Sequence, residues 1–305
     1  MLHMSTSNCL IKTGEYMTKY NLLIAALCLV IGALFLASTP FLFAAPPHSN
    51  HVVLVVEENH SYASVINNPA MPYFNSLARG YSLLTNYYAN THYSIPNYMM
   101  MTTGQIATRN DAYTGTIAVD NLARELLISG KTWKSYAESL PSVGFLGLYS
   151  GAYVKRHNPM AYFTDVANST VERQYLVPFT EFSRDLSSGA LPNFSYIAPN
   201  LLHDAHNGSL GAADSWLKQN IAPLMNNPQF QQDGILIIVF DESNFADKIH
   251  GGGHIAAVVV GPAVKRGYRS TTFFQHQSVL RTILDTFGNT NAPSLTSAAP
   301  VFDVF

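Results

Sequence analysis

Acidic and amide side chains directly follow two strongly apolar runs that lie far apart in the sequence. Glu58 and Asn59 come after the run HVVLVV, and Asp241 and Glu242 come after GILIIVF. Carboxylate and amide oxygens are hard ligands of the kind that bind divalent cations in proteins. Local spacing does not identify a metal site here, because its ligands would come from distant segments that only the fold can bring together.

A serine at the start of an expected helix is the candidate nucleophile. Ser94 precedes Ile95-Pro96-Asn97 and a Met-rich run. Proline early in a helix loses no hydrogen bond, so this segment predicts a helix with Ser94 as its N-cap. A phosphate group would bind at the same helix end. The residues alone leave two interpretations open, a cap or a nucleophile. A metal ion nearby would lower the pKa of the hydroxyl and favour the nucleophile.

Histidines also cluster after apolar runs. The segment HDAH (203–206) follows NFSYIAPN, and KRH (155–157) follows GFLGLYS after a loop. His250 and His254 flank three glycines in KIHGGGHIAAVVVGP, where glycine would let the backbone approach a ligand closely. The alternative is a flexible loop with two surface histidines. A P-loop is not predicted, because no Gly-Lys-Ser/Thr follows these glycines. The serine elbow of α/β-hydrolases is not predicted either, because Ser94 does not lie in a G-x-S-x-G sequence.

The apolar runs and the segments between them predict how these side chains are positioned. We expect buried strands at 51–56, 144–149, 193–198, 234–240 and 255–261, and helices at 70–79, 95–103, 120–128, 131–139, 211–225 and 275–287. Uniformly apolar strands alternating with helices indicate a mainly parallel sheet covered on both faces. Ligand sites of such sheets lie outside the carboxyl ends of the strands, so four strand ends would deliver polar side chains to one edge. Singly, each of these polar groups is also typical of a helix cap or a solvated loop.

Composition limits the classes of function. The chain has 305 residues, of which 48% are hydrophobic and 12% are charged, as expected for one large domain or two smaller ones. The net charge of −2 gives no basic patch for a nucleic acid. No internal repeat or linker follows Pro46-Pro47, and no obligate protein partner is evident, so we expect one domain over 46–305.

The N-terminal segment reads as an export signal. Lys12 and Lys19 precede a long apolar stretch that ends in small residues near Ala45, so residues 1–45 are predicted to be a signal peptide of a periplasmic or secreted protein. Because the stretch is long for a signal peptide, an uncleaved membrane anchor is the alternative interpretation. Both cysteines of the chain fall in this segment, so any metal in the domain must be held by oxygen and imidazole ligands.

Six stretches together resemble the phosphoesterase family of bacterial and fungal acid phosphatases and bacterial phospholipases C, which belongs to the alkaline-phosphatase superfamily. In order, they are VVLVVEENHSYASV, NYYANTHYSIPNYMMMTTGQ, YVKRHNP, NLLHDAHNG with ADSWLKQNI, IVFDESN with GGGHIAAVVVGP, and FFQHQSVLRTILDTFG. They cover nearly all of 51–290, and the first, second and fifth are specific.

The resemblance implies a three-layer α/β/α sandwich with a mainly parallel central sheet, as in alkaline phosphatase. It places Ser94 at the nucleophile position. By the same resemblance, a divalent metal ion, or two, would be held by Glu58, Asn59, Asp241 and Glu242 with Ser94 as a further ligand, while His157, Asp204 and His206 would line the phosphate pocket. His254 and His276 receive no definite role, and either could be structural.

The resemblance also has departures. Phospholipase C members carry Asp-His-Val-Pro-Pro after the acidic pair, whereas this chain has SNFADKIHGGGH. This difference favours an acid phosphatase that acts on monoesters. With the export signal, and with the metal site and nucleophile that the resemblance implies, we expect an exported, metal-dependent acid phosphatase that hydrolyses phosphate monoesters through a phosphoserine intermediate. The alternatives are a phospholipase C or phosphodiesterase, a phosphatase of lipid phosphomonoesters such as phosphatidylinositol phosphates, and a non-catalytic binding protein on the same fold. The expected partner is therefore a small phosphorylated substrate or a lipid phosphate.

Overall fold

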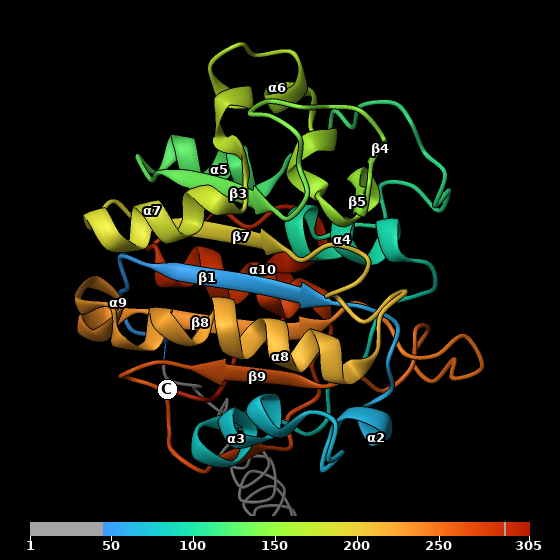
Figure 1. Ribbon diagram of the computed structural model, residues 1–305, viewed down its shortest axis with the longest axis vertical. Helices are drawn as coiled ribbons and strands as arrows, with labels where there is room; N and C mark the ends of the chain where they lie inside the picture. Colours follow the sequence, from blue (N-terminus) through green and yellow to red (C-terminus); the bar gives the residue numbers. More distant parts are fainter. Residues whose placement is uncertain (1–44, 290) are drawn as a thin grey trace, which may run out of the picture. The chain divides into compact units, whose positions relative to one another are not determined.

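The computed structural model describes residues 45–289 and 291–305 (Figure 1). Residues 1–44, and with them the predicted signal peptide or anchor, lie outside the described residues. Among the helices that are described, none has the length and apolar character needed to cross a membrane.

An eight-stranded sheet forms the centre of the described fold. Its strand order is β10 (Arg269–Ser270), β2 (Ser82–Leu84), β9 (Ala257–Val260), β8 (Ile235–Phe240), β1 (Val52–Glu57), β7 (Phe194–Ala198), β3 (Trp133–Ala137) and β6 (Leu176–Pro178). Strand β9 is antiparallel to both of its neighbours, and every other pairing is parallel. The central strands β1, β7 and β8 are buried at every residue, which explains why they read as continuous apolar runs.

Helices cover both faces of this sheet. They are α2 (Tyr62–Val65), α3 (Pro72–Gly80), α4 (Ser94–Thr103), α5 (Leu122–Ile128), α6 (Thr164–Ala167), α7 (Thr180–Ser188), α8 (Leu210–Asn220), α9 (Pro228–Asp233) and α10 (His276–Thr286), with short 3-10 helices at η1 (Lys155–His157), η2 (Pro159–Tyr162), η3 (Glu172–Tyr175), η4 (Ala222–Asn226) and η5 (Ser294–Ala298). Helix α8 lies in front of the sheet in Figure 1 and packs against α3, whereas α10 lies behind it and packs against α4. The predicted three-layer α/β/α architecture is confirmed.

Two predicted elements are wrong. The segment 131–139, predicted as a helix, contains strand β3, because Trp133 and Tyr136 are aromatic strand formers that bury fully between β7 and β6. The segment 144–149, predicted as a strand of the sheet, is mostly loop. Only its last residue enters a small antiparallel hairpin, in which β4 (Tyr149–Ser150) pairs with β5 (Tyr153–Val154). Glycine at 144 has φ +72°, a left-handed conformation that does not continue a strand.

The register of the central strands determines which side chains meet. Strand β1 pairs in parallel with β8, with Glu57 opposite Phe240, so the next residues, Glu58 and Asp241, leave the sheet side by side. Strand β7 flanks β1 on the other side, and its end leads into the HDAH segment. Three of the four predicted strand ends therefore share one edge. The fourth, His157, reaches this edge from η1 after the hairpin rather than from the sheet.

Candidate active site

Ser94 is the first residue of α4, and its hydroxyl faces a carboxylate. The hydroxyl donates a hydrogen bond of 3.0 Å to Oε2 of Glu58, and Ser94 is only 3% exposed. The prediction that Ser94 is the N-cap is wrong: the cap residue is Tyr93, and no cap side chain accepts a helix N–H. Asp111 takes over this task from another segment, since its Oδ1 accepts the N–H of Ile95 at 3.0 Å. The hydroxyl of Ser94 therefore does not cap the helix and is bonded to Glu58 in the site instead.

The loop before Ser94 is fixed by a buried amide. Oδ1 of Asn97 accepts the N–H groups of Asn90 and Thr91, both at 3.2 Å. Its Nδ2 donates to the carbonyl oxygens of Thr91 at 2.7 Å and Tyr93 at 3.1 Å. These four hydrogen bonds explain why asparagine follows the proline, and they set the position from which Ser94 enters the helix.

Three carboxyl groups are buried together beside this serine: Glu58, Asp241 and Glu242. Oδ1 of Asp241 accepts the N–H of Asn59 at 3.0 Å and that of Glu242 at 2.6 Å, and its buried Oδ2 has no hydrogen-bond partner in the described part of the chain. Burial, and then the charge of Asp241, raises the pKa of Glu58 well above its usual value and that of Glu242 to about 9. Burial also raises the pKa of Asp241 to about 7.

This carboxyl group cluster fits a divalent cation. Buried like charges are costly without a compensating cation, and the free Oδ2 of Asp241 is an available oxygen ligand. The geometry brings Glu58, Asp241 and Ser94 into one group and places Glu242 beside Asp241. Asn59 reaches the group through its backbone N–H, with φ +58°.

His157 connects two of the buried carboxyl groups. Its Nδ1 lies 2.9 Å from Oδ2 of Asp204, and its Nε2 lies 3.2 Å from Oε1 of Glu58. Asp204 is fixed in turn, because its Oδ1 accepts the N–H of His206 at 2.8 Å and its carbonyl accepts the N–H of Glu58 at 2.7 Å. Burial raises the pKa of Asp204 to about 7 and lowers that of His157 well below its usual value.

A second possible set of metal ligands shares Glu58. One ligand atom each from Glu58, His157 and His206 lie within 4.8 Å of one another. His206 is the outermost of the three, with Nε2 at 3.2 Å from a guanidinium nitrogen of Arg156 and Nδ1 at 2.8 Å from Oδ1 of Asn207. The structure thus brings together two overlapping groups of potential ligands, one of carboxylates and one with two imidazoles.

Three site residues were not identified from the sequence. Tyr98 donates its hydroxyl hydrogen to Oε1 of Glu58, His92 pairs with Glu242, and Arg156 lies 3.8 Å from Asp111. The position of Tyr98 could have been inferred, because residues four apart on a helix share a face and Tyr98 is four residues after Ser94. No sequence signal relates His92 to Glu242, which lies at the end of a distant strand.

The two remaining histidines have different surroundings. His276 is fully buried; its Nε2 is 2.6 Å from the carbonyl oxygen of Asp241 and its Nδ1 is 3.2 Å from the hydroxyl of Tyr87. Burial lowers the pKa of His276 to about 4, so the ring is neutral and holds the backbone of Asp241 through this carbonyl contact. His254 instead contacts the carbonyl oxygen of Thr85 at 3.0 Å and stacks on Tyr62 at 4.3 Å. These contacts indicate a structural role for His254.

The sequence of this chain is similar to a known protein family and to two named phosphatases. The model of the Phosphoesterase family matches residues 64–289. A phosphatidylinositol-3-phosphatase of Mycobacterium tuberculosis is 32% identical over 264 residues, covering 86% of this chain and 85% of that protein. An acid phosphatase of Aspergillus fumigatus is 33% identical over 218 residues, covering 68% of this chain and 48% of that protein. The chain therefore spans about half the length of the fungal relative.

Solved structures give the same fold. A protein of the alkaline phosphatase superfamily from Vibrio parahaemolyticus superposes with a TM-score of 0.57 at 14% identity, covering 84% of this chain and 71% of that one. The predicted alkaline-phosphatase-like fold is confirmed by this similarity. The match of the family model over most of the sequence shows that the chain belongs to the Phosphoesterase family, and the predicted enzyme class, a phosphoric-ester hydrolase, is confirmed.

Proposed function

We propose that this protein is an exported, metal-dependent acid phosphatase that hydrolyses phosphate monoesters through a phosphoserine at Ser94. The observation that carries the proposal is the buried hydroxyl of Ser94, 3.0 Å from Glu58 in a cluster of carboxyl groups that a cation would neutralise. The names of the two relatives, an acid phosphatase and a phosphatidylinositol-3-phosphatase, support a monoester substrate.

The metal ligands in this proposal are Glu58, Asn59, Asp241 and Glu242, with Ser94 as a further one. The Oδ2 of Asp241, which has no hydrogen-bond partner in the described part of the chain, and the high pKa values of the buried carboxyl groups support the three carboxylate ligands. Asn59 is included because the sequence resemblance implies it. When bound, a divalent cation would supply the positive charge that stabilises phosphate oxygens and lowers the pKa of a nearby hydroxyl.

The protein's own groups would move the proton and hold the nucleophile. Ser94 would give its proton to Glu58 along their hydrogen bond while its oxygen forms a bond to phosphorus and the bond from phosphorus to the leaving oxygen breaks. Hydrolysis of the phosphoserine by water would release inorganic phosphate and restore Ser94. Asn97 keeps the attacking residue in place through the loop before it.

The two histidines of the pocket suit different tasks. His157 is 2% exposed and lies between Asp204 and Glu58, so it would hold the carboxylate of Glu58 in position beside Ser94. His206 is only partly buried and is the outermost of these residues, so it would protonate the departing alcohol. Arg156 also lines a small pocket together with Asp111 and Tyr113.

Export remains part of the proposal and has its own test. The Lys-flanked apolar stretch ending near Ala45 supports cleavage, and the protein would then start near residue 45 or 46. Intact-mass measurement of the exported protein would give this start directly. Retention of Met1 or Met17 in a membrane fraction would favour the uncleaved anchor instead.

A phosphate-release screen tests the activity. Monoesters, including phosphatidylinositol phosphates, and diesters, including phosphatidylcholine, would be compared with chelator and after metal add-back. We expect monoester hydrolysis that chelator abolishes and metal restores. Release from diesters alone would favour a phospholipase C or phosphodiesterase, and no release from either class would favour a binding protein.

A further inference from the structure

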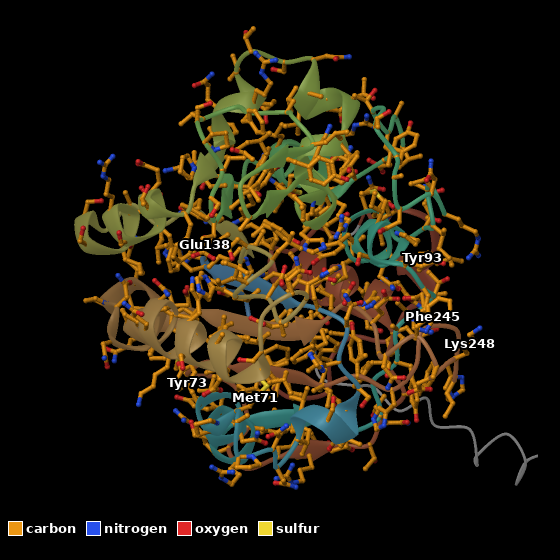
Figure 2. All side chains as sticks on the ribbon, turned by 45° about the vertical axis from the view of Figure 1, so that its right-hand side comes forward. Met71, Tyr73, Tyr93, Glu138, Phe245 and Lys248 are labelled. Atoms are coloured by element: carbon orange, nitrogen blue, oxygen red, sulfur yellow. The ribbon has the colours of Figure 1, made fainter. Side chains whose placement is uncertain are left out.

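Exposed aromatic side chains gather beside the proposed site. Tyr93 is 50% exposed and Phe245 is 56% exposed, and their rings stack with centroids 5.7 Å apart. The Nζ of Lys248 lies 4.9 Å from the centre of the Phe245 ring. Figure 2 shows these three side chains together on one side of the molecule. Ile249, which follows Lys248, is 58% exposed. We call Tyr93, Phe245, Lys248 and Ile249 the aromatic rim.

Residues of the aromatic rim are close in sequence to two residues of the proposed site. Tyr93 immediately precedes Ser94, and Phe245 lies three residues after Glu242. The His92 ring lies 5.2 Å from the Phe245 ring and pairs with Glu242. Any surface that contacts the rim therefore lies next to the nucleophile.

The loop that carries Phe245 is held by inward-facing bonds of Asp247. Its Oδ2 accepts the N–H of His254 at 2.9 Å and the hydroxyl of Ser243 at 3.2 Å, and its Oδ1 accepts the N–H of Ile249 at 3.1 Å. The negative charge of the loop is therefore bound internally, whereas Lys248 is exposed. The rim presents two aromatic rings and a cation outward.

This combination matches the chemistry of an anionic bilayer surface. Tyrosine and phenylalanine rings bury favourably at the level of lipid headgroups, and lysine directs its ammonium toward lipid phosphates. Rings that are half exposed suit contact with an extended surface better than enclosure of a small molecule.

We propose that the aromatic rim docks this enzyme on an anionic phospholipid bilayer, so that phosphomonoester lipids in that bilayer reach Ser94. The inference rests on the proposed phosphatase function and names its substrate class as membrane-embedded phosphomonoesters. Docking itself needs no turnover, so it is tested separately from catalysis.

The test measures sedimentation of the exported protein with vesicles that contain no phosphomonoester. Vesicles of phosphatidylcholine alone would be compared with vesicles of phosphatidylcholine and phosphatidylserine. We expect binding to the anionic vesicles, weakened about tenfold by Phe245→Ser or Ile249→Ser and about fivefold by Lys248→Gln. Matched controls are Ile128→Ser, which changes an isoleucine 69% exposed on α5, and Lys131→Gln, which changes a lysine 5.6 Å from the Phe287 ring. A thermal melt would show that each variant is folded.

The proposal is overturned by any of three results. The wild-type protein fails to bind anionic vesicles, or the rim variants bind as the wild type does, or the control variants weaken binding as much as the rim variants. If vesicle binding stays constant while the rim variants raise KM for a soluble aromatic monoester, the rim is a substrate contact and docking is wrong. If the wild-type protein binds anionic vesicles but releases no phosphate from any monoester, the proposed function is wrong and docking remains supported.

Discussion

The carboxylate of Glu58 is shared between Ser94 and His157. Oε2 accepts the hydroxyl of Ser94 at 3.0 Å, and Oε1 lies 3.2 Å from Nε2 of His157. Asp204 contacts the other ring nitrogen of His157 at 2.9 Å. The four side chains form one connected row from the end of β7 to the start of α4, so a change in any of them alters the surroundings of the hydroxyl.

Glu58→Gln should reduce kcat/KM about a hundredfold or more, because the amide keeps the size of the side chain but loses its charge and its basicity. The adjacent Glu57→Gln is the matched control. Glu57 is equally buried, but among the described residues neither of its carboxyl oxygens has a hydrogen-bond partner, whereas Glu58 is bonded to Ser94. It should keep kcat/KM within about threefold of wild type. Equal losses in the two variants would show that a buried carboxyl at this strand end matters only for folding.

Asp241→Asn should lower metal content and activity together. The substitution keeps one oxygen but removes the charge of a group whose Oδ2 has no hydrogen-bond partner among the residues that the structure describes. Elemental analysis of the purified protein and kinetics across a metal titration would measure both effects, and activity should recover in part at high metal concentration. Wild-type activity in metal-depleted buffer would show that Asp241 is not a ligand.

Asp204 should act mainly through His157. Asp204→Asn leaves His157 without its carboxylate partner and should lower kcat about tenfold to a hundredfold. In a double-mutant cycle, adding His157→Asn should then cost little more, because residues that act as a unit are not additive. Fully multiplicative losses would mean that the two side chains work independently.

His254 and His276 should differ when each is replaced by phenylalanine. His254→Phe retains stacking on Tyr62 and loses one hydrogen bond, which should cost about 1 kcal/mol of stability and little activity. His276→Phe leaves the carbonyl of Asp241 and the hydroxyl of Tyr87 without their partner, which should cost about 1–3 kcal/mol and also lower activity. Urea unfolding and kcat/KM would be measured on both. A larger loss of stability and activity in His254→Phe than in His276→Phe would contradict the roles assigned to the two histidines.

The central fold could be predicted from the sequence because each central strand is buried on both faces and reads as an apolar run. Segment 131–139 could not be predicted in this way. Its polar residues Lys134 and Ser135 interrupt the run, and the partners that make it a strand, β7 and β6, come later in the chain.

The site was predictable only in part for a similar reason. Acids after β1 and β8 were visible, and the parallel register brings Glu58 beside Asp241. The group that bonds the first turn of α4 could not be predicted, because Asp111 approaches Ile95 from a loop whose path the sequence does not specify. The pairing of His92 with Glu242 could not be predicted either, because it depends on the direction of the Glu242 side chain after a distant strand.

The role of Ser94 is tested by comparing stability and turnover in Ser94→Ala. Because Asp111 and not Ser94 bonds the helix N–H of Ile95, the substitution removes one hydrogen bond to Glu58 and should cost about 1 kcal/mol. Turnover should fall by several orders of magnitude, with only the residual catalysis that the pocket provides. Turnover within about tenfold of wild type would leave Ser94 as a structural residue.

Trapping of the intermediate tests the central claim most directly. The wild-type enzyme would be mixed with a monoester carrying labelled phosphate, quenched in acid, and digested for peptide mapping. The proposed mechanism predicts label on the hydroxyl of Ser94, in the peptide that contains Ile95-Pro96-Asn97, and none in Ser94→Ala. Label on a histidine, or turnover with no labelled peptide at any quench time, would contradict a phosphoserine mechanism.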